Sequence, residues 1–141
     1  MSCVLGIDIG GTSIKAGLFT PEGKLVEVKK IPTGAIDDEK AFAEVCEGLS
    51  SLVVGAGFLP DDVTAVGLDI PGPVDDSGRV GMLPNIRLDP DGLKTAIKHE
   101  FGNAALAFVN DANAAALGEL WQGSARDLSS FVMVKIGRAH V

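Results

Sequence analysis

The chain has few of the features that would place it in a membrane or on a nucleic acid. It holds 12 Lys and Arg residues against 19 Asp and Glu residues, a formal net charge of -7 at pH 7, and its basic residues form no cluster. Nucleic-acid binding depends on phosphate neutralisation, so this composition argues against a nucleic-acid partner. No apolar run approaches the roughly 18 residues of a membrane span, and no basic stretch followed by an apolar block opens the chain. We therefore expect a cytoplasmic protein with no membrane partner.

Cysteine and histidine are equally scarce, with two residues of each. Cys3 and Cys46 are far apart and fit no Cys-x-x-Cys spacing, so we expect two buried thiols rather than a disulfide. His99 and His140 form no metal-ligand pattern, and we expect no metal held by protein ligands alone within this chain. Apolar residues make up 46% of the 141 residues and charged residues 22%, which is the balance of a globular domain with a core.

The hydrophobic pattern predicts an alternation of strands and helices. Short apolar runs indicate strands, and apolar residues at helical spacing indicate helices. The expected strands are Val4–Ile9, Ser13–Phe19, Leu25–Ile31, Val63–Ile70, Leu106–Val109 and Ser129–Val134, and the expected helices are Glu39 to about Gly55, Gly92–Phe101 and Asn110–Trp121. Tight turns join the first three strands, which predicts an antiparallel meander, and the helix before the fourth strand predicts that this strand pairs parallel to the first. This order favours a mixed sheet with helices on its faces.

Two adjacent glycines, Gly10 and Gly11, separate the first two strands, with Asp8 before them and Thr12 and Lys15 after them. The dinucleotide fingerprint GxGxxG is absent, and Thr12 stands where a Walker loop needs lysine. The backbone N–H groups of Gly10 to Thr12 could close on a phosphate, the Thr12 hydroxyl could donate to it, and Asp8 could hold a hydrated Mg²⁺ as an indirect ligand. Lys15 either lies near the phosphates or is a solvated edge lysine. The glycine pair alone is equally compatible with a plain hairpin turn.

The stretch from Asp8 to Thr12 resembles the phosphate-1 hairpin of the actin-like ATPase and sugar-kinase superfamily. Three further stretches, GLDIPGPVD, LPNI and VNDANAAALGE, follow in order, and with them the chain up to Val134 resembles the first part of the ROK family of sugar kinases and repressors. The resemblance implies an α/β fold of the ribonuclease H-like (actin-like ATPase) type, here truncated. It also implies ATP-dependent phosphorylation of a hexose, with glucose as the default acceptor and ATP and Mg²⁺ as cofactors.

Other functions of the same family stay open. Kinases of N-acetylmannosamine, N-acetylglucosamine and fructose share much of the pattern, and so do sugar-sensing ROK regulators. The regulators place a DNA-binding helix-turn-helix module before the core, whereas the glycine turn here begins within ten residues of Met1. We therefore expect the kinase branch of the family.

The resemblance assigns four residues to the sugar side. It implies that Asp111 is the catalytic base, which contacts the sugar and takes the proton from the attacking hydroxyl, and that Asn110 contacts the sugar beside it. It implies that Gly72 contacts a sugar hydroxyl through its backbone and that Asn85 does so through its amide. The residues alone also allow plainer roles: Asn110 or Asp111 as a helix cap, and Gly72 between its two prolines as a rigid turn.

The last seven residues differ in character from the rest. Residues 136–141, IGRAHV, are also what ATC GGA AGA GCA CAC GTC encodes, one frame of a common sequencing adapter. We expect residues 1–110 to form the first domain, 111–134 to begin a truncated second domain, and 135–141 to be adapter read-through. On this interpretation the second phosphate loop, the adenosine-binding segments, further sugar ligands and a structural Zn²⁺ site belong to the missing part. The resemblance further implies that the complete protein is a homodimer or homotetramer and that the fragment has no useful kinase activity.

Overall fold

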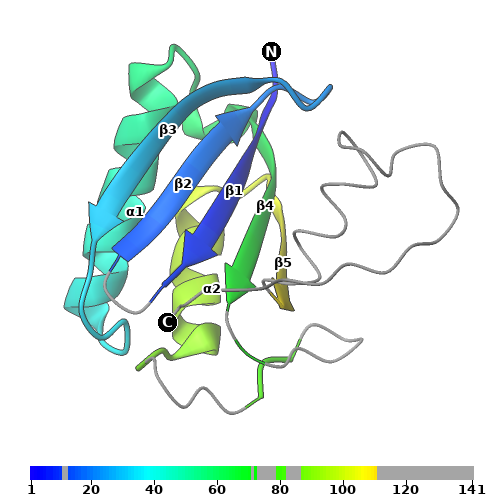
Figure 1. Cartoon of the computed structure of the whole chain (residues 1–141). Helices are drawn as coiled ribbons and strands as arrows, with labels where there is room; N and C mark the ends of the chain where they lie inside the picture. Colours follow the sequence, from blue (N-terminus) through cyan, green and yellow to red (C-terminus); the bar gives the residue numbers. More distant parts are fainter. Residues whose placement is uncertain (11–12, 71, 73–78, 82–86, 111–141) are drawn as a thin grey trace, which may run out of the picture.

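The computed structural model describes residues 1–10, 13–70, 72, 79–81 and 87–110 (Figure 1). Their elements, in chain order, are β1 (Cys3–Ile9), β2 (Ser13–Phe19), β3 (Leu25–Pro32), α1 (Glu39–Gly55), the short 3-10 helix η1 (Pro60–Asp62), β4 (Val63–Ile70), α2 (Pro90–Glu100) and β5 (Ala105–Asn110). The predicted strand over residues 129–134 lies outside the described residues, and so does the predicted helix beyond residue 110.

The five strands form one mixed sheet in the order β3-β2-β1-β4-β5. β1 pairs antiparallel with β2, and β2 pairs antiparallel with β3, which confirms the predicted meander. β4 pairs parallel with β1 on one side and parallel with β5 on the other, as the intervening helices require. The sheet therefore joins a hairpin-connected half to a half built from parallel crossovers.

The turn between β2 and β3 shows why its sequence, TPEGK, ends one strand and starts the next. The Thr20 N–H donates to the Lys24 carbonyl at 2.8 Å, and the Lys24 N–H donates to the Thr20 hydroxyl at 3.1 Å. Gly23 has a φ of 94°, a backbone conformation that glycine adopts without steric cost. The turn between Thr20 and Lys24 therefore reverses the chain where the sequence predicts it.

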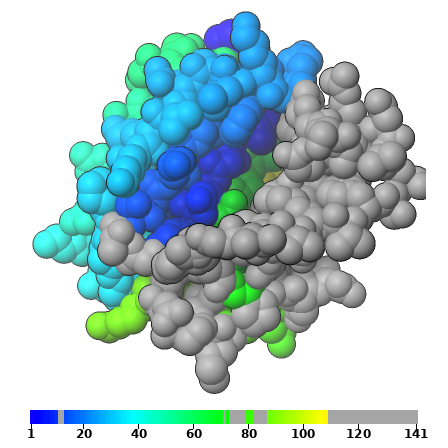
Figure 2. Space-filling view, in the orientation of Figure 1, coloured from blue at the N-terminus to red at the C-terminus, as the bar shows by residue number. Residues whose placement is uncertain are grey.

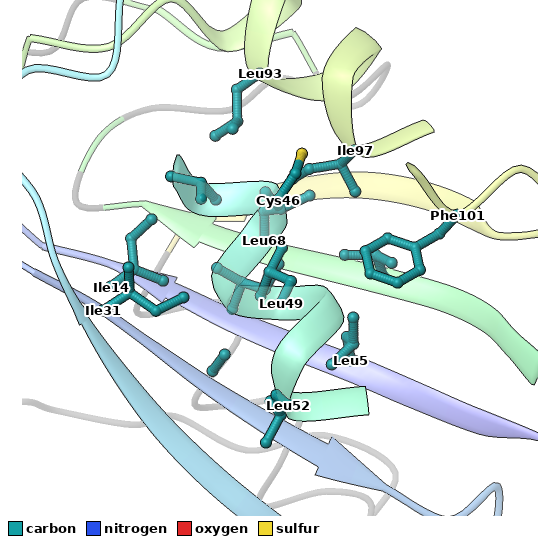
Figure 3. Close-up of a cluster of buried hydrophobic side chains, with 14 of the residues drawn as sticks. Leu5, Ile14, Ile31, Cys46, Leu49, Leu52, Leu68, Leu93, Ile97 and Phe101 are labelled. Carbon is teal, nitrogen blue, oxygen red and sulfur yellow. The ribbon is translucent and has the colours of Figure 1, made fainter. Parts of the chain in front are cut away.

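The core lies between one face of the sheet and the helices α1 and α2, which both pack on that face (Figures 1 and 3). The largest fully buried side chains come from all of these layers: Leu5, Ile7, Ile9, Ile14, Leu18, Ile36, Leu49, Leu68, Ile70, Leu93, Ile97 and Phe101. We call this side the helix-covered face. The other side, which carries Val4, Gly6 and Asp8 of β1 and their partners in register, is the opposite face.

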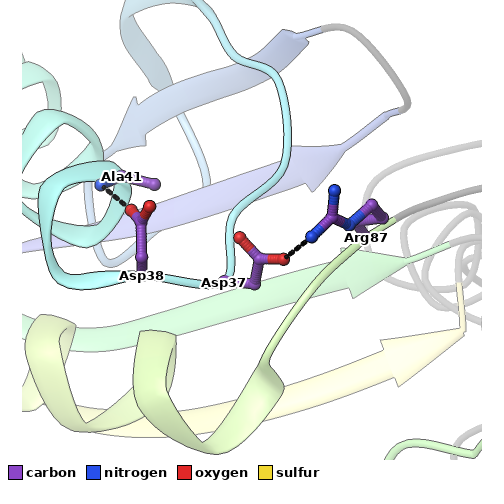
Figure 4. A network of polar contacts seen from close by, with 4 residues as sticks. All are labelled: Asp37, Asp38, Ala41 and Arg87. Atoms are coloured by element: carbon purple, nitrogen blue, oxygen red, sulfur yellow. Dashed lines mark hydrogen bonds and ion pairs between the residues drawn. The ribbon is translucent and has the colours of Figure 1, made fainter.

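Helix α1 begins where its sequence places an acidic cap. The Asp38 carboxylate accepts a hydrogen bond from the Ala41 N–H at 2.8 Å (Figure 4), which satisfies one of the free donors of the first turn. Before it, Asp37 forms an ion pair of 2.8 Å with Arg87, and Ile36 forms a parallel bridge with Leu88. The loop before α1 is therefore held against the segment that leads into α2.

Helix α2 begins at Pro90, two residues before the predicted start at Gly92. Asp89 caps the helix by accepting from the Gly92 N–H at 3.1 Å, and proline suits the first helical position because its missing N–H has no partner there. The helix ends at Glu100, so Phe101 is its cap and remains fully buried. The prediction missed the start because it followed the apolar spacing and overlooked the Asp-Pro signal.

The boundary after β5 also differs from the prediction. Asn110, expected as the first residue of a helix, is the last residue of β5, where it pairs with Ile70 of β4. The strand also begins one residue earlier than expected, at Ala105. Pairing with β4 extends β5 beyond its apolar run, since a ladder can continue through a polar residue. The 3-10 helix η1 was not predicted.

Both cysteines are free and buried, as expected. Burial, together with a smaller contribution from the negative charge of Glu100, raises the pKa of the Cys46 thiol to about 11. Burial also raises the pKa of Cys3, with a smaller contribution from Asp62.

The described residues contain no helix long and apolar enough to cross a membrane.

Candidate active site

Three strands bring the predicted site residues to one edge of the sheet. β4 is parallel to both of its neighbours, so β1, β4 and β5 end at the same edge (Figure 1). β1 carries Asp8 and leads to Gly10, β4 leads to Gly72 two residues past its end, and β5 ends on Asn110. Ligands of open α/β sheets bind outside the carboxyl ends of the strands. The topology therefore brings together the phosphate side and the sugar side of the predicted site.

The glycine turn is a strand–turn–strand, as the prediction required. Ile9 pairs with Ile14, and the Gly10 N–H donates to the Ser13 carbonyl at 2.9 Å. A Cβ on Gly10 would lie 3.3 Å from that carbonyl oxygen, which is a tight contact. The Gly10 N–H thus closes the hairpin instead of facing a phosphate. Gly11 and Thr12, the other predicted phosphate donors, lie outside the described residues.

Asp8 and Lys15 lie opposite each other in the β1–β2 ladder, and both are exposed. Their neighbours along each strand, Ile7 and Ala16 among them, are buried on the helix-covered face, so both charged side chains belong to the opposite face. Figure 2 looks onto this face, where β1 and β2 reach the surface in two shades of blue. A carboxylate and an ammonium group therefore stand side by side at the base of the glycine turn.

Gly17, which belongs to the same motif, has a packing role. A Cβ at this position would lie 2.9 Å from Cε1 of Phe19, closer than real Cβ atoms approach other atoms. The Phe19 ring also lies near Gly6, where a Cβ would be 3.4 Å from the same atom. The ring therefore covers two glycines of the opposite face. This explains Gly17 without a ligand.

The described residues include part of the predicted sugar side. Gly72 is described, and Asn110 is described as the terminal residue of β5. Asn85 and Asp111 lie outside the described residues, so their sugar-binding and catalytic roles stay predictions.

One acidic residue of this edge was given no role by the sequence motifs. Asp69 pairs in register with Asp8 across the parallel β1–β4 ladder. Leu68 and Ile70 on either side are fully buried on the helix-covered face, so Asp69 belongs to the opposite face, where it is half-buried with its Oδ1 oxygen inaccessible to solvent. The signal was present in GLDIPGPVD, as an acid at the end of an apolar strand. Its pairing with Asp8, however, becomes visible only in the sheet.

The donor chemistry of this edge suits a hydrated magnesium ion. Carboxylate oxygens are the ligands that Mg²⁺ takes from proteins, and it keeps several water ligands when only one or two carboxylates are present. Asp8 and Asp69 provide such a pair. Within the described residues there is no group of three or more His, Cys, Asp and Glu side chains that could hold a metal ion.

The mixed sheet with two helices on one face and a glycine hairpin at its carboxyl edge is the fold of the actin-like ATPase and sugar-kinase class. A model of the ROK family matches residues 4–139 of this chain. The chain belongs to the ROK family.

Relatives and solved structures agree with this assignment. The chain is 30% identical to a glucokinase of Halalkalibacterium halodurans over 94% of this chain and 41% of the relative. It is 32% identical to a beta-glucoside kinase of Listeria monocytogenes over 95% of this chain and 43% of that protein. A xylose repressor of Caldicellulosiruptor bescii is 28% identical over 95% of this chain and 34% of its own length.

Among solved structures, the chain is similar to a ROK family glucokinase from Streptomyces griseus in complex with glucose and AMPPNP. The TM-score is 0.72 and the identity 33%, over 89% of this chain and 38% of the other. The chain thus spans about two fifths of the length of the kinases that it matches.

Proposed function

We propose that the complete protein to which this chain belongs transfers the γ-phosphoryl group of ATP to a hexose, with glucose as the acceptor and glucose 6-phosphate as the product. Membership of the ROK family supports a sugar-directed function. The similarity to a glucokinase structure that holds glucose and AMPPNP supports the two substrates.

The observation that carries the proposal is the common edge of β1, β4 and β5. Asp8 and Lys15 flank the glycine turn there, and the strands that lead to Gly72 and Asn110 end beside it. A kinase has to hold a phosphate chain and an acceptor hydroxyl next to each other, because phosphoryl transfer is catalysed mainly by positioning and charge stabilisation. A phosphate turn and a sugar pocket at this common edge would meet that requirement.

In the proposed reaction a sugar hydroxyl oxygen forms the new bond to the γ-phosphorus. The bond between that phosphorus and the bridging oxygen of the β-phosphate breaks, and its electron pair leaves with ADP. The hydroxyl proton passes to the carboxylate of Asp111. Asp8 holds the hydrated Mg²⁺ as an indirect ligand, Gly11 and Thr12 donate to the phosphates, and Lys15 offsets their negative charge. Mg²⁺, when bound, neutralises charge on the phosphate oxygens.

The identity of the acceptor sugar is a separate question within the proposal. The similarity to glucokinases of about 30% identity supports glucose, while the similarity to a beta-glucoside kinase adds beta-glucosides to the candidates. N-acetylmannosamine, N-acetylglucosamine and fructose remain alternatives within the family. A panel of these sugars with ATP, read by ADP release, decides among them through the ratio of kcat/KM values.

A sugar-sensing regulator is the second candidate, favoured by the similarity to a xylose repressor. A regulator would bind its sugar without consuming ATP. Calorimetry with each sugar, run beside the ADP assay on the same preparation, separates the two: sugar binding without phosphorylation would establish the regulator.

Three further properties complete the proposal. We place the protein in the cytoplasm, which the two free, buried thiols of Cys3 and Cys46 support. We expect the complete protein to be a homodimer or homotetramer. A structural Zn²⁺ site is expected only in the part of the protein beyond this chain.

The test uses the complete protein encoded by the source gene, with Asp111→Asn as the variant. Loss of the base should lower kcat by about 10²- to 10⁴-fold while the KM for the sugar changes little. Asp61→Asn removes the same charge from an exposed position in η1, which precedes β4 and lies away from the site edge, and should leave both constants unchanged. Full activity of Asp111→Asn would overturn the mechanism, and inactivity of the unaltered protein on every sugar would overturn the kinase proposal.

A further inference from the structure

The loop of residues 33–38, which we call the β3–α1 loop, starts beside the glycine turn and ends beside the predicted sugar segment. β2 is antiparallel to both β1 and β3, so β3 runs in the direction of β1 and ends at the site edge. Pro32, the last residue of β3, pairs in register with Ser13, which begins β2 directly after the glycine turn. At its far end the loop contacts residues 87–89, which directly follow the LPNI stretch.

Backbone hydrogen bonds join the β3–α1 loop to these residues. The Ile36 N–H donates to the Arg87 carbonyl at 2.8 Å, and the Asp89 N–H donates to the Ile36 carbonyl at 2.9 Å. The two bonds form the parallel bridge between Ile36 and Leu88, and the Ile36 side chain is 1% exposed. Because Ile36 is buried in the core, the bridge fixes the backbone that follows the LPNI stretch to the folded domain.

An ion pair lies beside this bridge. The Arg87 guanidinium donates from Nη2 to Oδ2 of Asp37 at 2.8 Å (Figure 4). The Arg87 side chain is 80% exposed and that of Asp37 is 32% exposed. Exposed ion pairs contribute little to the stability of a fold, because water screens the charges and two side chains lose their freedom. A function of this pair is therefore better sought in the position of the residues that precede Arg87.

Asn85, to which the proposed function assigns a contact with the sugar, precedes Arg87 by two residues and lies outside the described residues. Two residues of extended chain span about 7 Å, so the Cα of Asn85 lies within that distance of the Cα of Arg87. A contact that holds Arg87 therefore restricts where the Asn85 amide can stand. Holding a ligand-binding group in place before the ligand arrives raises the affinity, because less ordering remains to be done on binding.

We propose that Asp37 and Arg87 are positioning residues of the sugar site: their ion pair, added to the Ile36–Leu88 bridge, holds the chain so that Asn85 meets the sugar. Neither residue contacts the sugar itself. The inference rests on the proposed function and names what orients one of its sugar ligands. It also predicts a salt effect, because an exposed ion pair is screened by salt whereas a neutral sugar is not.

The experiment titrates the complete protein with the sugars of the panel above, glucose first, by calorimetry without nucleotide. Arg87→Gln and Asp37→Asn should each weaken sugar binding by about 2- to 5-fold, the range open to an exposed ion pair. The double variant should bind like either single variant, because each change removes the same pair. Lys24→Gln is the matched control: it removes a positive charge from the exposed turn at the other end of β2 and should bind sugar normally.

Salt provides a second measurement on the same variants. Raising NaCl from about 0.05 M to about 0.5 M should weaken sugar binding by the unaltered protein towards that of Arg87→Gln, because the ion pair is screened. The affinity of Arg87→Gln should stay constant over this range. Arg87→Lys keeps the charge and should retain most of the affinity at low salt. An equal salt dependence in the unaltered protein and Arg87→Gln would contradict the inference.

A double-mutant cycle tests whether the pair acts through Asn85. Asn85→Ala removes the amide, and Arg87→Gln should then cause no further loss of sugar affinity, because there is no longer an amide to position. If Arg87→Gln weakens binding equally in both backgrounds, or if Asn85→Ala binds sugar normally, the inference is overturned. A merely structural role also overturns it: Arg87→Gln would then lower the unfolding temperature and leave the sugar affinity unchanged.

The inference and the proposed function fail in separate ways. If the unaltered protein phosphorylates a hexose but Arg87→Gln keeps its sugar affinity, only the role of the ion pair is wrong. If the protein binds a sugar in a manner that depends on Arg87 and Asn85 but phosphorylates none, the kinase proposal is wrong and the positioning role stands. If the protein neither binds nor phosphorylates any sugar of the panel, both are overturned.

Discussion

The two faces of the sheet are built from the same strands and serve different purposes. Along β1, Leu5, Ile7 and Ile9 are buried beneath α1 and α2, whereas Asp8 between the last two is exposed on the opposite face. A strand alternates its side chains between faces, so each residue of β1 contributes either to the core or to the site edge, and not to both. Stability should therefore depend on the helix-covered face and chemistry on the opposite face.

The largest expected effect on stability lies at Phe101, whose ring is fully buried at the end of α2 (Figure 3). Phe101→Ala should lower the free energy of unfolding by about 3–5 kcal/mol, because the cavity adds to the lost burial. Urea unfolding followed by far-UV circular dichroism measures it. Leu59→Ala is the control: this side chain is 66% exposed, and its loss should change the stability by less than about 0.5 kcal/mol. Equal effects at the two positions would refute the proposed division.

The next effect is a pH dependence from Cys46 in α1. Its thiol has a pKa of about 11 in the folded chain, against 9.0 for the unburied group. Between these values the folded chain keeps a proton that the unfolded chain loses, so stability falls as the pH rises from 9 towards 11. The total is about 2–3 kcal/mol at about 1.4 kcal/mol per pKa unit. Unfolding free energies measured across this range should fall less steeply in Cys46→Ala, and identical slopes would contradict the assignment.

A smaller effect tests how closely the two helices pack. A Cβ on Gly92 would lie 2.5 Å from Cζ of Phe42 in α1 and 2.5 Å from Oδ2 of the capping residue Asp89, so Gly92→Ala should cost about 1–3 kcal/mol through overpacking. Gly55→Ala is the matched control, because a Cβ at this last residue of α1 would meet nothing within 4 Å. The control should be neutral or stabilising by up to about 1 kcal/mol, since alanine favours the helix. Thermal unfolding of both variants measures the difference, and equal stabilities would show that Gly92 has room for a Cβ beside Phe42 and Asp89.

The smallest expected effect on stability lies at Asp8, on the opposite face of the sheet. Asp8→Asn should change the unfolding free energy by less than about 0.5 kcal/mol, because the side chain is exposed. In the complete protein it should weaken metal–nucleotide binding by about 10- to 100-fold. Ile7→Asn, one residue earlier on the buried face, should instead prevent folding by burying a polar group. Unchanged Mn²⁺·AMPPNP binding in Asp8→Asn would contradict the role of the opposite face.

Much of the fold could be predicted because its signals are local. The alternation in β1 and β2, the apolar stripe of α1 and the Thr20–Lys24 turn each depend on residues a few positions apart. Errors occurred where a boundary depends on capping or on pairing with a distant strand. Asp89 and Pro90 start α2 earlier than the apolar pattern does, and pairing with β4 carries β5 through Asn110.

The candidate site also contains features that the sequence predicted and features that it did not. The glycine turn and its flanking Asp8 and Lys15 could be recognised from one short stretch, since a motif keeps its residues near each other along the chain. The same stretch did not reveal that the Gly10 N–H closes the hairpin on Ser13, because this depends on the turn geometry.

Residue types, spacing and periodicity along the chain were sufficient for the strands, the helices and the motifs, because these follow from interactions between near neighbours. The meeting of Asp8 with Asp69 was decided by the packed sheet alone. These residues are 61 positions apart in the chain, and their register depends on β4 lying beside β1 with its apolar side chains turned towards α1 and α2. A shift of one residue would turn Asp69 into the core, so burial of Leu68 and Ile70 holds the second carboxylate at the site.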